Sequence, residues 1–150
     1  MTKLERITSK PHALMELLAV KFTVPLVPPS VNHYKMPVIV RKAGGHTIRS
    51  FAVTPEGRAY KAAVQIYARG QTIAPRSTTE RTKVRYALRV TVYLGKGQRG
   101  DGDNFWKCVA DGLVDAGVIH SDARVRDWHM SVRDDDRENP RTEIQAEVIV

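Results

Sequence analysis

The fold is indicated most clearly by residues 84–94, which read VRYALRVTVYL. Large apolar side chains occupy every second position, from Val84 to Leu94, and the positions between them include Arg85 and Arg89. Successive side chains of a β-strand point to opposite faces, so this pattern predicts a strand with one face in a core. The other face is expected to be exposed and partly basic.

Upstream of this strand, the sequence predicts a series of short elements separated by turn signals. A helix is expected over 11–19, a strand over 20–27, and a hairpin of two strands, 38–42 and 47–53, around Ala43-Gly44-Gly45-His46. Thr54-Pro55-Glu56 is typical of a helix start, with Thr54 as the N-cap, and Gly70 is the matching stop. A polar, basic loop is expected over 71–82.

Downstream of the strand, a second helix and two more strands are expected. The helix is predicted from Asn104 to Ala116, with Asp103 as its N-cap and Gly117 as its stop. Alternating apolar positions over 126–132 and 142–150 indicate two antiparallel strands joined by an acidic turn.

Strands and helices therefore mix without a regular βαβ rhythm, which favours the α+β class. A chain of 150 residues is about one domain. We expect an N-terminal extension over 1–20, with its short helix, followed by one domain over 21–150. That domain should have a mixed or antiparallel sheet with about two main helices packed on it.

The charge is distributed unevenly along the chain. Residues 1–100 carry eighteen Lys and Arg against four acids, whereas residues 101–150 carry six against twelve. This asymmetry predicts a surface that binds a polyanion beside a separate carboxylate-rich place. Since carboxylates repel phosphate, acids in a nucleic-acid binder point to a metal site. The alternative is a solvated basic surface with no partner.

Several classes of protein are disfavoured by composition and spacing. One cysteine, Cys108, excludes an intrachain disulfide framework, and the apolar stretches are too short for a membrane span, so a cytoplasmic protein is expected. Residues 95–100, GKGQRG, match the dinucleotide pattern G-x-G-x-x-G. The strand before them alternates, whereas a doubly wound parallel strand is apolar on both faces. We therefore expect a basic loop beside a phosphodiester, with no nucleotide cofactor.

The carboxylates Asp101, Asp103 and Asp122 form the candidate metal set. In extended chain Asp101 and Asp103 project to the same side, and six extended residues over 117–122 could bring Asp122 back to them. Oxygen ligands without His or Cys suit Mg²⁺ or Mn²⁺. Lys107 lies four residues after Asp103, on the same helical face. On spacing alone, a helix cap, a turn and a surface Asp–Lys pair explain these residues equally well.

At this point the sequence resembles the RusA-type Holliday junction resolvases over roughly residues 21–150. The resemblance rests on four stretches in order: residues 28–34 (PPSVNHY); 54–57 (TPEG) with Tyr60; Asp101-x-Asp103-Asn104-x-x-Lys107 followed by Asp111-Gly112-Leu113; and 121–125 (SDARV). It implies that Asp101, Asp103 and Asp122 are metal-binding catalytic acids and that Lys107 is the catalytic lysine. Many members have two adjacent acids where this chain has Ser121-Asp122, so one acid of that pair is missing.

The resemblance further implies a homodimer that uses Mg²⁺, with Mn²⁺ as a substitute, and cuts opposed strands of a four-way DNA junction in recombination and repair. Two alternatives remain open: a branched-DNA-binding protein without catalysis, and a less selective metal-dependent nuclease for flaps or single strands. Candidate DNA contacts are Arg85, Arg89, Lys96 and Arg99 for the backbone, Asn32, His33, Tyr34 and Lys35 for the branch region, and Asn104 for a phosphate or ligand. For residues 32–35, a structural turn after Pro28-Pro29 is the alternative.

Overall fold

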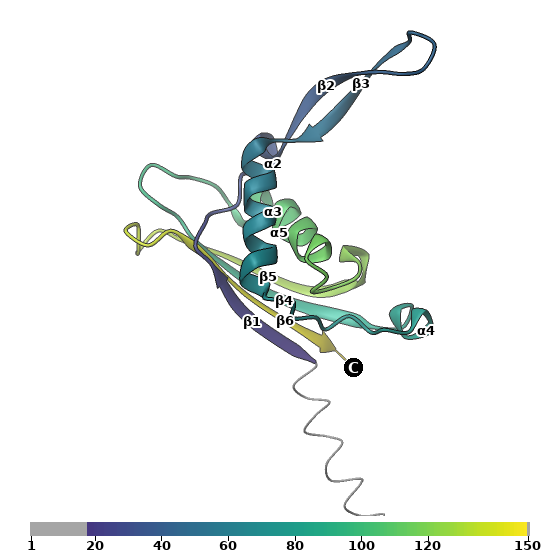
Figure 1. The fold of residues 1–150 in the computed structure, drawn as a ribbon. Coiled ribbons are helices and arrows are strands. Elements are labelled where there is room, and N and C mark those ends of the chain that lie inside the picture. The colour runs from purple at the N-terminus through teal and green to yellow at the C-terminus, as the bar shows by residue number, and fades with distance from the viewer. Residues whose placement is uncertain (1–17, 150) are drawn as a thin grey trace, which may run out of the picture.

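A four-stranded sheet lies at the centre of the computed structural model, which describes residues 18–149 (Figure 1). Its strands run in the order β1 (Ala19–Val24), β6 (Arg141–Ile149), β4 (Arg85–Tyr93) and β5 (Val125–Arg133). β4 and β5 are parallel, and the other neighbouring pairs are antiparallel. The predicted α+β class with a mixed sheet is confirmed.

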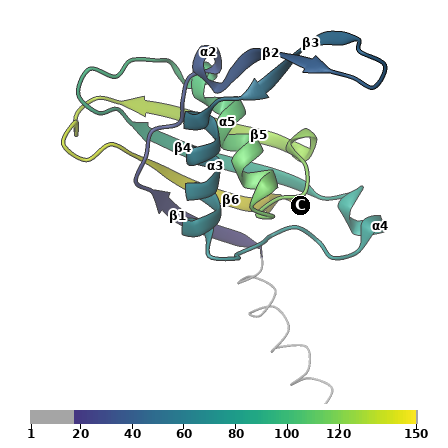
Figure 2. The same ribbon diagram turned by 45° about the horizontal axis from the view of Figure 1, so that its top comes forward.

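Two long helices, α3 (Pro55–Ala68) and α5 (Gly102–Asp115), pack on one face of this sheet (Figures 1 and 2). The apolar side of β4 faces them, and its residues Tyr86, Leu88, Val90 and Val92 are at most 1% exposed. The two helices also contact each other, with Val64 and Leu113 fully buried. Among residues 18–149 no helix covers the opposite face, so the sheet and its helices form two layers.

The ends of α3 lie close to where the sequence predicts them. Thr54 is the N-cap, and its Oγ1 accepts a hydrogen bond from the Gly57 amide at 3.1 Å. The helix ends at Ala68, followed by Arg69 and Gly70 in the left-handed region, at φ 54° and 71°. The predicted N-cap and stop are thus confirmed.

Two details of the C-terminal half differ from the prediction. α5 begins two residues early, so that Asp101 is its N-cap and Asp103 already lies in its first turn. The strands β5 and β6 run in opposite directions but are not neighbours, because β4 lies between them and pairs with both. Because β4 is central and buried, the backbone N–H and C=O groups along both of its edges need hydrogen-bonded neighbours. A β5–β6 hairpin would leave one of these edges open.

A separate two-stranded ribbon projects from this body (Figure 1). The short helix α2 (Val31–Tyr34) leads into β2 (Lys35–Arg41), which pairs antiparallel with β3 (Thr47–Val53). We call residues 35–53 the arm. The predicted hairpin is confirmed, although its first strand begins three residues before the predicted 38–42.

The remaining segments are short. The predicted loop 71–82 contains one helical turn, α4 (Thr78–Arg81), and a 3₁₀ turn, η1 (Asp122–Arg124), precedes β5. The helix predicted over 11–19 lies outside the described residues, except that Ala19 belongs to β1. Within residues 18–149, neither long helix has the length and apolarity that crossing a bilayer requires.

Candidate active site

The candidate site centres on Lys107, where α5 passes the η1 turn. The Lys107 Nζ lies 3.0 Å from Asp111 Oδ1, one turn along the same helix, and 3.5 Å from Asp122 Oδ2. The Tyr34 hydroxyl donates a 2.7 Å hydrogen bond to the other oxygen of Asp111. One chain of polar contacts therefore joins α2, α5 and η1.

The electrostatics of this chain keep Lys107 charged. Its hydrogen bond to Asp111 is the main cause that raises the pKa of Lys107, and the nearby Asp122 carboxylate acts in the same direction. Burial, followed by the bond to Asp111, raises the pKa of Tyr34, which therefore stays a neutral donor. Because the Lys107 side chain is 47% exposed, the site offers a held positive charge that an anion can reach.

Asp101 and Asp103 lie at the N-terminus of α5. Within residues 18–149 neither carboxylate has a hydrogen-bond or ion-pair partner, and Asp101 makes no capping bond. The positive end of the helix dipole favours negative charge there. Gly102 between them packs on β5, where a Cβ would lie 2.8 Å from the Cγ of Met130. A glycine at this position thus lets the acids sit close against the edge strand.

The three predicted metal ligands are not gathered at one point. Asp122 contacts Lys107, which follows Asp101 by six residues. Six residues correspond to about 9 Å along the helix axis. The extended return path predicted over 117–122 is wrong, because Gly117 has φ 73° and the Val118 amide bonds back to the Leu113 carbonyl. After this turn the chain reaches Lys107, which Asp122 contacts at 3.5 Å. In the described part of the chain, no three His, Cys, Asp or Glu side chains are grouped so as to hold a metal ion.

The donor chemistry of these acids nevertheless fits a hard divalent cation. Carboxylate oxygens without His or Cys are the ligands that Mg²⁺ and Mn²⁺ take in proteins. Asp101 and Asp103 have no competing partner among residues 18–149, whereas Asp122 has a long contact to Lys107. The residue types fit such an ion, and Asp101 and Asp103 are the two most ready to bind it.

Some of the predicted DNA contacts surround the start of α5. His33 and Arg99 line a hollow of about 340 Å³, together with Pro28, Pro29, Ser30 and Phe105. Asn32 and Lys35 are exposed on either side of His33, and half-buried Asn104 lies in the first turn of α5. These residues share one end of the molecule with Asp101 and Asp103.

Other predicted contacts lie elsewhere. Tyr34 is 1% exposed and committed to Asp111, so it supports the site from within and does not offer its ring at the surface. Arg85 and Arg89 are exposed on the helix-free face of the sheet, so the sheet separates them from the acids. Lys96 is exposed and pairs with Glu138 at 2.8 Å.

Two features of the site were not predicted. Asp111, the partner of Lys107, could have been found from its i, i+4 spacing, which is the spacing already noted between Asp103 and Lys107. The rings of Trp106, which precedes Lys107 in α5, and Trp128 stack at 4.5 Å, and Trp128 is partly exposed. No sequence signal links these two residues, because they meet only through the packing of α5 on β5.

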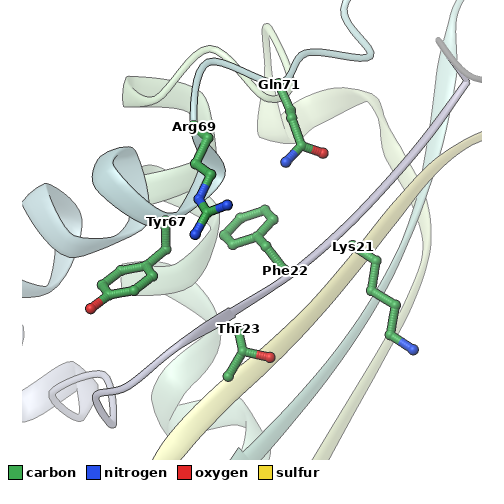
Figure 3. A pocket seen from close by; sticks show the side chains of 6 residues that line it. All are labelled: Lys21, Phe22, Thr23, Tyr67, Arg69 and Gln71. Atoms are coloured by element: carbon green, nitrogen blue, oxygen red, sulfur yellow. The ribbon is translucent and has the colours of Figure 1, made fainter.

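A further hollow lies away from this site, between β1 and the end of α3 (Figure 3). The residues that line it are Lys21, Phe22, Thr23, Tyr67, Arg69 and Gln71. None of the predicted site residues lines this hollow.

A comparison with protein families finds a match that includes the residues at the start of α5. The family model described as "Endodeoxyribonuclease RusA" matches residues 27–147. The chain belongs to the RusA endodeoxyribonuclease family. A comparison with curated proteins finds no match. The RusA match includes both α2 and the whole segment from Asp101 to Asp122, and it begins after β1.

Proposed function

We propose that this RusA-family protein is a metal-dependent endodeoxyribonuclease that resolves four-way DNA junctions as a homodimer. The observation that carries the proposal is the placement of Lys107, held between Asp111 and Asp122 on the helix that begins with two carboxylates, neither of which has a partner among residues 18–149. Hydrolysis of a phosphodiester needs both a positive charge near the phosphate and an activated water. This helix supplies the positive charge of Lys107, and it supplies the carboxylate ligands for a metal ion that would activate the water.

In the proposed mechanism, Asp101 and Asp103 would hold Mg²⁺ or Mn²⁺, and Asp122 would join them by exchanging its 3.5 Å contact with Lys107 for the ion. When bound, such an ion lowers the pKa of a water and polarises the scissile phosphate. Lys107 offsets the negative charge that builds on the phosphoryl oxygens in the transition state. Asp111 and Tyr34 hold the ammonium group in place, so no reorganisation is needed as the charge develops.

DNA binding in this proposal uses the basic and polar residues at the same end of the body. His33 and Arg99 line the hollow beside α5, and Asn32, Lys35 and Asn104 lie close in sequence to residues that line it. Phosphate contacts of this kind position the duplex and carry little base readout. Arg85, Arg89 and Lys96 would contact a more distant part of the branched DNA, because the helix-free face points away from the acids.

The homodimer is part of the proposal because a four-way junction has two-fold related strands. A C₂ dimer offers two copies of one site to those strands and can cut both in one encounter. A monomer would mostly leave a nicked junction. Light scattering gives the oligomeric state, and a supercoiled cruciform plasmid separates nicked from linear product. A monomeric protein would overturn this part.

The nuclease proposal is tested on a four-way junction, a flap and a linear duplex of matched sequence, with Mg²⁺ and with EDTA. We expect cutting of the junction only, and only with the metal. Equal cutting of all three DNAs would replace the resolvase with a less selective nuclease. Tight junction binding with no cutting would replace the enzyme with a DNA-binding protein.

A further inference from the structure

The arm exposes large apolar side chains of the kind that are buried in the body. Ile39 is 75% exposed and Phe51 is 73% exposed, the highest values for large apolar residues among residues 18–149. In the described part of the chain, both strands of the ribbon pair only with each other. An isolated two-stranded hairpin is marginally stable in water, and exposed apolar side chains that stand together mark an interaction site.

The arm is also uniformly basic. Lys35, Arg41, Lys42 and Arg49 lie within it, and no Asp or Glu occurs anywhere between Glu16 and Glu56. A second copy of the arm would repel it, whereas the phosphates of a nucleic acid complement it. The charge therefore favours a polyanion as the occupant of this surface.

The register of the ribbon divides its residues into two different faces. Residues directly opposite one another share a face, and in this hairpin the odd-numbered residues of both strands share one. That odd face carries all three charges of the strands, on Lys35, Arg41 and Arg49, together with Pro37, Ile39 and Phe51. The even face, with Met36, Val38, Val40 and Ile48, carries no charge.

On the odd face the apolar residues form one patch flanked by cations. Phe51 lies opposite Pro37 and is the diagonal neighbour of Ile39, within reach of an aromatic side chain. Arg49 and Arg41 follow toward the tip, and Lys35 lies at the base. Proteins that kink or open DNA use this combination: apolar wedges enter a base step while neighbouring cations bind the phosphates. A two-stranded ribbon also has the width of a major groove.

The arm is anchored directly on the candidate active site. Tyr34, the residue before β2, donates to Asp111, the partner of Lys107. Gly57 at the start of α3 leaves room for this anchor, because a Cβ there would lie 2.8 Å from the Tyr34 ring and 2.7 Å from Val53 at the end of β3. The orientation of the arm is thus tied to the position of Lys107.

We propose that the odd face of the arm inserts Phe51, with Ile39 beside it, into the branch point of the junction, where bases are least well stacked. Arg41, Lys42 and Arg49 bind the flanking phosphates. This inference rests on the proposed function for the identity of the DNA, and it adds the part of the chain that recognises the branch.

The test uses a four-way junction with 2-aminopurine beside the branch point, in EDTA so that binding is observed alone. Wild type should raise the fluorescence, because insertion unstacks the base. Phe51→Ala should abolish the rise and weaken junction binding about tenfold, in line with the loss of one stacked aromatic, while linear-duplex binding changes little. Val40→Ala on the even face is the matched control and should behave as wild type.

A second variant tests the cations. Arg41→Ala with Arg49→Ala should reduce the slope of log affinity against log salt by about 1.8 for two lost phosphate contacts, on both junction and linear DNA. Circular dichroism checks that the variants are folded; truncation of such exposed side chains should leave the spectra unchanged.

The outcomes separate this inference from the proposed nuclease. Junction cutting by a wild type that gives no fluorescence rise overturns the wedge alone, and a fluorescence rise without cutting overturns the nuclease alone. An unchanged Phe51→Ala protein also overturns the wedge. If Phe51→Ala or Val40→Ala converts a dimer into monomers by light scattering, the arm binds a second copy of the chain, and the DNA assignment is overturned.

Discussion

The body and the arm use the same kind of sequence in opposite ways. β4 in the body and β2 and β3 in the arm are all rich in Val, Ile and aromatic residues. In β4 the apolar face is covered by α3 and α5, and Val92 is fully buried. In the arm Val53 packs against the core at the base, but Ile39 and Phe51 remain exposed.

The difference indicates that apolar residues stabilise the fold in the body, whereas those of the arm are available to bind another molecule. Burial of apolar area stabilises the body by roughly 25 cal/mol for each Å² removed from water, and the arm gains little of this. Natural sequences keep such exposed apolar groups mostly where they bind something. The candidate catalytic residues lie at the boundary, on α5 in the body but tied to the base of the arm by Tyr34.

The largest expected effect concerns the acids of the body. Asp101→Asn, Asp103→Asn and Asp122→Asn should each lower junction cleavage by orders of magnitude, because each removes a metal ligand, while junction binding is kept or tightened as negative charge is removed. Asp127→Asn, on the helix-free side of β5, is the control and should cleave as wild type. Single-turnover cleavage and binding in EDTA measure the two halves. A fully active Asp101, Asp103 or Asp122 variant removes that residue from the ligand set.

The next prediction compares the loss of Lys107 with the loss of the charge on its partner Asp111. Lys107→Ala should lower the cleavage rate by about 10²–10³, the scale for one electrostatic group in a transition state, and should leave dimerisation and junction affinity within a few-fold of wild type. Asp111→Asn keeps one acceptor oxygen for Lys107 but loses the carboxylate charge that raises the pKa of Lys107. Its rate should fall less and should begin to drop at a lower alkaline pH than wild type. Identical pH–rate profiles would limit Asp111 to a structural role.

A third prediction compares stability directly. Leu113→Ala removes a fully buried side chain between α5 and α3 and should lower the free energy of unfolding by about 2–5 kcal/mol. Ile39→Ala in the arm removes a similar volume from an exposed position and should change it by no more than about 0.5 kcal/mol. Urea denaturation measures both. Equal losses would show that the arm is packed in solution, against another copy of the chain.

The smallest expected effect is a pH dependence within the body. Burial, with Arg81 and Arg124 nearby, lowers the pKa of His120 below its ordinary 6.5, and the ring Nδ1 lies in a 2.7 Å hydrogen bond with the Tyr86 hydroxyl. Below about pH 6.5 the unfolded chain binds the proton more readily, so stability should fall as the pH drops through this value. His120→Gln should flatten that fall in urea midpoints measured from pH 8 to pH 5. A variant with the wild-type slope would assign the fall to another group.

The sequence by itself determined the elements and the family. Alternation over 84–94 marks β4, Thr54, Pro55 and Gly70 mark the ends of α3, and the Gly44-Gly45 turn marks the arm, because each signal is a local preference of a few residues for one backbone conformation. The four stretches at 28–34, 54–57, 101–113 and 121–125 together indicated the RusA family, which the match over residues 27–147 confirms.

Only the tertiary structure decided which elements meet. Alternation shows that one face of a strand is apolar but not what covers that face, so the same pattern gave a core strand in β4 and an exposed ribbon in the arm. Strand edges pair through backbone groups common to all residues, which is why the insertion of β4 between β5 and β6 could not be read from their side chains. The burial of Tyr34, its bond to Asp111 and the arrival of Asp122 beside Lys107 likewise depend on how far-apart segments pack.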